Sequence, residues 1–315
     1  MLKEHLTILV VHGRGFKPGE GAYAEITYEA LRAGLERDYP DSVPAFDTIN
    51  LEFAYYGDLA NACLKADGQE YDEVLDIGDR RNALMALREI KARKRFGIRD
   101  YDRAKGKTAL KEFAADIIAP LSVTVGLTMR LIRRGSPDVA DYFEGPSEYR
   151  ETLRRRVRSK LKAILDRGEC VMLISHGTGS IIAYDVLWQL SHDPQYAEEY
   201  RDRKIDHWVT MGAPLGNSTI KKRLLGRDRN NAERFPTNII TWQNLSAEDD
   251  YTCHDKSLAN DYSRMMKEHH VSQIQDFRIF NLAVRYGTSN PHSSVGYFIH
   301  PRLSKIIADW IAENS

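Results

Sequence analysis

The chain has 315 residues, of which 42% are hydrophobic and 29% charged, enough for one large α/β domain or two smaller ones. Lysine plus arginine and aspartate plus glutamate both total 45, so the net charge is zero and no global field favours nucleic acid as a partner. The cysteines Cys63, Cys170 and Cys253 lack metal-type spacing and are typical of reduced thiols. Because the first residues run straight into a predicted strand, we expect no signal peptide and a cytoplasmic protein.

The N-terminal segment predicts a first βαβ unit. An almost continuous apolar strand over Leu6–Val11 ends in the turn His12-Gly13-Arg14-Gly15-Phe16. A helix over Tyr23–Arg37 and a strand over Ile49–Tyr55 follow. Glycines in the turn let the backbone approach a ligand closely, and its N–H groups could face a developing negative charge. The alternative is a tight turn between strand and helix with no further role. The turn lacks the third glycine of a dinucleotide-binding loop, so we expect no such cofactor.

The stretch 57–145 departs from the alternation of strands and helices. It has long helical patterns, a basic segment at 91–95 and no convincing strand, which predicts a helical insertion or cap on the sheet. Within it, 114–132 is largely apolar, but internal charges and a proline argue against a membrane span and favour a buried cap helix. Arginines near its end leave open a peripheral contact of 114–134 with a lipid surface.

The centre of the chain combines a strand, a tight turn and a helix. A basic helix over Tyr149–Arg167 precedes a short apolar strand, Val171–Ile174. The turn Ser175-His176-Gly177-Thr178-Gly179 follows, and a helical pattern begins directly after it. Further strands are predicted at His207–Met211, Asn238–Trp242 and Phe277–Val284, with a surface loop over most of 217–236 and a closing helix from Pro301.

The central strand, turn and helix resemble the nucleophile elbow of α/β-hydrolases, normally Gly-x-Ser-x-Gly, with Ser175 and Gly179 as the two outer small residues. Ile-Ala-Tyr-Asp-Val-Leu over 182–187, Gly-Ala-Pro-Leu over 212–215 and Trp-Gln-Asn over 242–244 are similar to bacterial lipase- and esterase-like members of that superfamily. The resemblance covers nearly the whole chain outside the insertion. It implies a single α/β-hydrolase domain over 1–315, with a mostly parallel, doubly wound sheet and the 57–145 cap within it.

Residue by residue, the resemblance implies an elbow, an acid and a base in the chain order of these enzymes. His292, in a loop after the last strand, would be the general base. Asp250 would hold its tautomer as the acid, with Asp249 as the alternative acid. Backbone N–H groups of Gly13, Arg14 and Thr178 would form the oxyanion hole. The alternatives are an aspartate pair that only caps a turn, a His292 without a partner, and His254 as a substitute base.

The nucleophile position is occupied by Gly177, which has no side chain to attack a carbonyl or carry an acyl group. Glycine adopts the strained elbow conformation without a Cβ penalty, so the fold should survive the substitution. Ser175, at the strand end, and Ser180, inside the helix, should not occupy the exposed tip. The side chain of Thr178 should point away from it. The glycine is either an engineered replacement of a serine or a natural loss, and the surviving acid and base loops favour a recent or deliberate one.

The sequence therefore predicts a serine-hydrolase scaffold for carboxylic esters, including acyl or lipid esters, that turns over little as written because residue 177 is glycine. We expect a small-molecule ester or lipid-like ligand, no nucleic acid, no cofactor and no metal. The competing hypothesis is a non-catalytic binding or signalling protein of the same fold, which keeps its cleft for a small apolar ligand or a partner.

Overall fold

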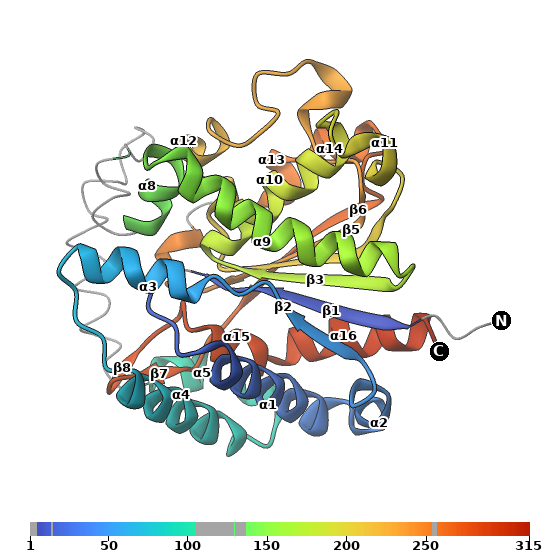
Figure 1. Ribbon diagram of the computed structural model, residues 1–315. Coiled ribbons are helices and arrows are strands. Elements are labelled where there is room, and N and C mark those ends of the chain that lie inside the picture. The colour runs from blue at the N-terminus through green and yellow to red at the C-terminus, as the bar shows by residue number, and fades with distance from the viewer. Residues whose placement is uncertain (1–4, 14, 105–128, 130–136, 254–256) are drawn as a thin grey trace.

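A parallel β-sheet with six strands forms the centre of the computed structural model, which describes residues 5–13, 15–104, 129, 137–253 and 257–315 (Figure 1). The strands are β1 (Leu6–Val11), β2 (Asn50–Phe53), β3 (Cys170–His176), β4 (Ile205–Met211), β5 (Ile239–Ala247) and β6 (Gln273–Ile279). Their order is β2-β1-β3-β4-β5-β6, and every neighbouring pair is parallel. All six strands therefore end at one edge of the sheet.

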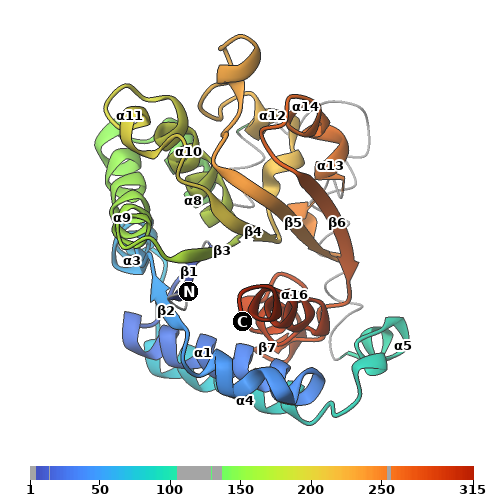
Figure 2. The ribbon, with the colours of Figure 1, turned by 90° about the vertical axis from the view of Figure 1, so that its right-hand side faces the viewer.

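Helices cover both faces of the sheet (Figure 2). One layer contains α1 (Glu20–Asp38), α4 (Glu73–Arg88), α15 (Ser294–Phe298) and α16 (Pro301–Glu313), which contact one another. The other contains α8 (Pro137–Glu144), α9 (Ser147–Asp166) and α10 (Thr178–His192), with α3 (Gly57–Ala66) beside α9. The shorter helices are α2 (Val43–Phe46), α5 (Ile98–Asp102), α11 (Ala197–Tyr200), α12 (Ser218–Lys221), α13 (Leu258–Asp261) and α14 (Ser263–Lys267).

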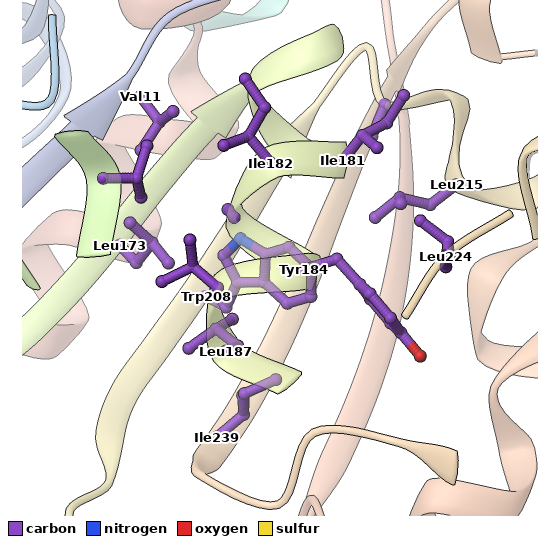
Figure 3. Close-up of a cluster of buried hydrophobic side chains, with 14 of the residues drawn as sticks. Val11, Leu173, Ile181, Ile182, Tyr184, Leu187, Trp208, Leu215, Leu224 and Ile239 are labelled. Atoms are coloured by element: carbon purple, nitrogen blue, oxygen red, sulfur yellow. The ribbon is translucent and has the colours of Figure 1, made fainter. Parts of the chain in front are cut away.

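Alternation along the central strands builds two separate apolar cores. Successive side chains of a strand point to opposite faces, so a strand buried on both sides is apolar at every position. In β1, Leu9 and Val11 join the cluster under α9 and α10, while Ile8 and Val10 join the cluster under α1 and α16. Figure 3 shows the first cluster, with Leu173 and Trp208 beneath side chains of α10. The prediction of an α/β fold with a parallel sheet is confirmed.

β5 and β6 differ most from their predicted bounds, whereas β2, β3 and β4 differ by one or two residues at an end. β5 runs on through Ala247, past the expected end at Trp242, because its polar side chains bond within the sheet. Asn244 accepts from Thr210 Oγ1 at 2.9 Å and donates to Asp276 of β6 at 2.9 Å. β6 begins at Gln273 and ends at Ile279, whereas the prediction continued to Val284. Val284 instead pairs in a small antiparallel hairpin, β7 (Val284–Arg285) with β8 (Thr288–Ser289).

The described parts of 57–145 contain helices α3, α4, α5 and α8 and no strand. α4 packs against α1 and α15, so this portion belongs to the helical layer beneath the sheet. The apolar stretch 114–132 lies outside the described residues apart from Met129, and its role as a cap helix or lipid contact stays a prediction. Among the helices that the structure describes, none combines the length and the apolarity needed to cross a membrane.

Candidate active site

The predicted site lies at the carboxyl edge of the sheet, where the chain reverses its direction of winding. β1 and β3 are neighbours, and the chain leads outward from them in opposite directions, to β2 on one side and to β4, β5 and β6 on the other. Ligands of open α/β sheets bind at such a switch point, outside the carboxyl ends of the strands. Gly13 follows β1 here, Gly177 follows β3, Gly212 follows β4, and Asp250 lies in the turn after β5.

Gly177 forms the sharp turn between β3 and α10. Its φ of 52° and ψ of −124° are accessible to glycine and strained for other residues. Its N–H donates to the Met211 carbonyl at 2.9 Å, and its carbonyl accepts from Ser180 N at 3.0 Å. At Gly179, any Cβ would collide with the carbonyl oxygen of His12, so only glycine lets α10 pass so close to the loop after β1. The strand, turn and helix predicted from the sequence are therefore present.

Asp250 and His292 are in direct contact. His292 Nδ1 lies 2.9 Å from Asp250 Oδ2, which also accepts from the Tyr297 hydroxyl at 2.8 Å. Thr252 donates to the other carboxylate oxygen from its backbone N at 3.0 Å, and its hydroxyl lies 2.9 Å from His292 Nδ1. Burial alone would raise the pKa of Asp250, but the charge of His292 and the hydrogen bonds from His292, Thr252 and Tyr297 hold that pKa well below its usual range. Asp250 is therefore an ionised, oriented acceptor at neutral pH.

Asp249, the alternative acid, faces a different partner. Its backbone has a positive φ of 59°, and its carboxylate accepts from the Tyr101 hydroxyl at 3.1 Å. Adjacent residues point in different directions, so the turn that brings Asp250 to His292 takes Asp249 to Tyr101. The structure thus separates two aspartates that the sequence left as alternatives.

The elbow tip and the imidazole converge on one point. A Cβ built on Gly177 would lie 3.1 Å from His292 Nε2 and 3.3 Å from Cε1, with the Gly13 Cα at 3.6 Å. Gly13 is itself packed on the elbow, since a Cβ there would lie 2.6 Å from His176 Nδ1 and 2.9 Å from the His176 carbonyl oxygen. The loop after β1, the turn at Gly177 and the imidazole of His292 therefore surround the position that a side chain at 177 would occupy.

Of the other residues predicted for the site, three are buried at or near the start of α10 and two lie outside the described residues. Thr178 is buried and begins α10, where the helix dipole favours negative charge. Ser175 and Ser180 are fully buried, with 3.0 Å between their hydroxyls, and Trp208 Nε1 donates to Ser175 at 2.9 Å. Arg14, the remaining oxyanion candidate, and His254, the substitute base, lie outside the described residues.

Two histidines near the elbow were not assigned a role from the sequence. His176 is buried against His292, with ring centroids 4.4 Å apart at 32°. Burial, followed by the charges of His292 and Lys17, holds the pKa of His176 well below its usual range, so its ring is neutral. His12 has its pKa lowered to about 3, mainly by burial. Its Nδ1 donates to the Gly13 carbonyl at 2.9 Å while Nε2 accepts from Tyr56 N at 3.0 Å, which fixes the loop after β1.

Thr252, Tyr297 and Gly212 were also missed as site residues. Thr252 and Tyr297 bond to Asp250, but nothing in their sequence spacing points to that carboxylate. Gly212 has a φ of 57°, and a Cβ there would lie 2.9 Å from both Asp250 Oδ2 and His292 Nδ1. The glycine at the end of β4 was the one available signal, because a conformationally free residue at a strand end often marks a close approach.

A pocket of about 1010 Å³ opens beside His176 and His292. Its walls come mainly from the loop after β1, the start of α4 and the segment before α15, with the polar residues Lys17, Tyr71, Asp76, Arg80, Arg285 and Tyr286 among them. Asp76 accepts hydrogen bonds from Arg80 at 2.9 Å, Arg285 at 2.6 Å, Tyr71 at 3.0 Å and Tyr286 at 3.1 Å. The wall therefore combines charged and hydroxylated side chains with apolar ones such as Phe16 and Leu75.

The contact between Asp250 and His292 gives the imidazole the geometry to take up and return a proton beside the pocket. A neutral His292 that donates Nδ1–H to Asp250 presents the lone pair of Nε2, which suits a general base. The described residues contain no group of three or more side chains positioned to hold a metal ion. The chain matches no family model, no curated protein and no solved structure.

Proposed function

We propose that the chain is an α/β-hydrolase-fold protein of the serine-hydrolase type, which binds carboxylic esters at a site whose nucleophile position is Gly177. One observation carries the proposal: the Cβ direction of Gly177 points at His292 Nε2 from 3.1 Å, with Asp250 bonded to the opposite side of the same imidazole. A serine at 177 would stand where its hydroxyl could give its proton to His292.

The assigned roles follow from this geometry. His292 is the general base, Asp250 orients it and stabilises its charged form, and N–H groups of the loop containing Gly13 and of Thr178 face the carbonyl oxygen of the ester. The order β2-β1-β3-β4-β5-β6, with the elbow after the central β3, supports the same fold. The single domain over 1–315 and the 57–145 cap belong to this proposal.

The wall of the pocket refines the ligand class. Lys17, Arg80 and Arg285 line it together with acidic, hydroxyl and apolar side chains, so an ester that carries both a polar or charged group and an apolar part suits it. A lipid-like ligand would need the stretch 114–134, of which the structure describes only Met129. Cys63, Cys170 and Cys253 form no disulfide with one another, which agrees with the cytoplasmic location that we propose.

Replacing the glycine tests the function directly. We expect Gly177→Ser to raise the hydrolysis of p-nitrophenyl esters by roughly 10²-fold or more over Gly177→Ala, because only serine adds a hydroxyl beside His292. Alanine is the matched control, since it introduces the same Cβ at the same φ of 52°. In both variants His292 must move back by a few tenths of an ångström. Equal rates in the two folded variants would contradict the proposal.

A non-catalytic binding or signalling protein is the competing function, favoured by the missing hydroxyl at Gly177 and the pocket of about 1010 Å³. His292→Gln in the Gly177→Ser background discriminates between them. Loss of turnover with the thermal unfolding curve unchanged supports the hydrolase. Unchanged turnover would show that the Asp250–His292 pair does not serve the chemistry.

A further inference from the structure

Beside the layer of α8, α9 and α10 lies a second pocket, of about 550 Å³, which shares no lining residue with the pocket next to His292. Its wall is formed by residues of these three helices and by the segment that follows α12. Five of the lining residues are cationic and one is acidic, namely Arg150, Lys222, Arg223, Arg227 and Arg229 against Asp228. In a chain whose net charge is zero, the pocket is therefore a local concentration of positive charge.

None of the five cations forms an ion pair with a residue that the structure describes. Their neighbours along the chain do: Arg154 of α9 pairs with Asp185 at 2.6 Å, and Lys221 of α12 pairs with Asp261 at 2.7 Å. Like charges on one wall repel one another, and a bound anion would relieve that repulsion. The pattern of pairing therefore separates these five cations from those that hold the fold together.

The segment that carries four of the cations is anchored on the core. Leu224 is buried in the cluster drawn in Figure 3, and Leu225 N donates to the fully buried carboxylate of Asp185 at 2.9 Å. Gly226 has a φ of 79°, and a Cβ there would collide with Trp188 Nε1, so the backbone passes close to α10. A fixed backbone has less freedom to lose when a ligand binds, which favours affinity.

Arginines dominate the wall and come from two elements. Arg150 reaches the pocket from α9, and its guanidinium donates to the Phe143 carbonyl at 3.2 Å. After α12, Arg229 N donates to the Gly226 carbonyl at 2.9 Å, a turn that keeps Arg227 and Arg229 on the wall of one pocket. A planar guanidinium binds a phosphate group through two parallel hydrogen bonds, so a wall with four arginines is typical of phosphate recognition.

The charge and size of the pocket narrow the ligand further. A single phosphate monoester carries about two negative charges, fewer than the surplus of cations over Asp228 in the wall. Two neighbouring phosphate groups match that surplus better. A volume of about 550 Å³ is typical of small-molecule sites, and Phe143 and Trp188 also line the pocket, so an organic part of the ligand would meet apolar surface.

We propose that this pocket binds a small organic ligand with two neighbouring phosphate groups, either free in solution or as the head group of a lipid. The site goes beyond the ester function, since none of its residues takes part in the contact between Asp250 and His292. Lys222, Arg223 and Arg229 are exposed, so the affinity should fall as salt screens their charges.

Inorganic pyrophosphate is the probe for a ligand in solution. We expect isothermal titration calorimetry at low salt to show one pyrophosphate bound per chain, with inorganic phosphate bound at least about tenfold more weakly. In Arg227→Gln/Arg229→Gln the affinity for pyrophosphate should fall about tenfold or more, because the ligand loses charge-assisted hydrogen bonds. Neither side chain bonds to another described residue, so the variant should fold, and a thermal unfolding curve verifies it.

Lys94→Gln/Arg99→Gln is the matched control, since it removes two exposed cations that do not line the pocket. It should bind pyrophosphate as the native chain does. Flotation with phosphatidylcholine vesicles, with and without a bisphosphorylated inositol lipid, tests the head-group form in the same three proteins. Binding of pyrophosphate, or of the inositol lipid alone, with a loss confined to Arg227→Gln/Arg229→Gln supports the proposal and identifies the source of the ligand. Equal losses in both variants, or no binding of either probe, would overturn it.

Discussion

Gly212 touches both partners of the Asp250–His292 contact without contributing a side chain of its own. Alanine in a left-handed conformation costs roughly 1–2 kcal/mol through the clash of its Cβ with the backbone. At 212 that Cβ would also stand 2.9 Å from Asp250 Oδ2 and His292 Nδ1, so it must push the two apart. The close approach of Asp250 and His292 therefore depends on a glycine at position 212.

We expect Gly212→Ala in the Gly177→Ser background to lose ester hydrolysis by on the order of 10²-fold and to be less stable. Gly168→Ala is the control that separates the cost of a strained backbone from the displacement of Asp250 and His292. Its φ of 68° is comparable, and its Cβ meets no atom within 4 Å. Urea unfolding measures the stability of each variant, and ester assays measure its activity. An equal loss of activity at both positions would argue against a specific role for Gly212.

The two neighbouring aspartates give a second residue-level prediction. In the Gly177→Ser background, Asp250→Asn should lower kcat by roughly 10³- to 10⁴-fold, since an amide no longer stabilises the charged imidazole or fixes its tautomer. Asp249→Asn should change kcat little, because Asp249 accepts from Tyr101 and asparagine tolerates the φ of 59°. A larger effect at 249 than at 250 would reverse the assignment.

For single residues, the sequence predicted which positions lie at the candidate site better than it predicted the contacts that each side chain makes there. The chain order of the predicted elbow, acid and base pointed to Gly177, Asp250 and His292, and the structure brings these three residues close together. It could not choose between Asp249 and Asp250, because turn dihedrals decide which carboxylate faces inward. His176 and Tyr297 were missed because their contacts with His292 and Asp250 join segments distant in sequence.

Among the elements, α16 is capped by a residue that titrates. His300 precedes the helix, and its Nδ1 accepts from Arg302 N at 3.0 Å, as an N-cap side chain does. Burial, then the charges of Arg37 and Arg302, lower the pKa of His300 to about 3. The unfolded chain binds a proton at this residue near pH 6.5, whereas the folded chain does not. Its contribution to stability is therefore complete above about pH 6.5 and is lost as the pH falls towards 3.

His300→Asn should remove this pH dependence while keeping a cap, since the asparagine side-chain oxygen can accept from the same N–H. Below about pH 6, the free energy of unfolding of the native chain should fall more steeply than that of the variant, by up to about 1.4 kcal/mol per pH unit. Urea titrations at pH 7, 6 and 5 measure both slopes. Parallel slopes would mean that His300 is not neutral in the folded state.

Apolar elements could be predicted more fully than polar ones. The bounds of β1 agree with the prediction, because a strand buried on both faces is apolar at every position. The second half of β5 was missed because Gln243, Asn244 and Ser246 break that pattern, although hydrogen bonds to neighbouring strands satisfy Asn244. The spacing of hydrophobic residues predicts strands whose side chains pack in an apolar core. A strand whose buried side chains are polar and hydrogen-bonded to neighbouring strands gives no such signal.

For the whole molecule, the composition of the pocket predicts a substrate profile. In Gly177→Ser, p-nitrophenyl esters with a terminal carboxylate should have a higher kcat/KM than neutral esters of equal length, because cationic side chains, Lys17 among them, line part of the wall. Lys17→Met should reduce the preference for the carboxylate over a neutral ester of equal length by about tenfold or more, the usual value of a charge-assisted hydrogen bond. A decanoate preference would instead favour the lipid-ester hypothesis.

The pairing of β1 with β3 sets the order in which a newly made chain can fold. Leu6 lies opposite Cys170, so the first strand has no β3 to pair with until the centre of the chain has emerged from the ribosome. At translation rates of about 5–20 residues per second, that wait is on the order of 10–30 s. Until then β1 can pair only with β2, and its other edge is open to aggregation or to a chaperone. Nascent chains that end before β3 should therefore bind chaperones and be cut by proteases more strongly than chains that extend past it.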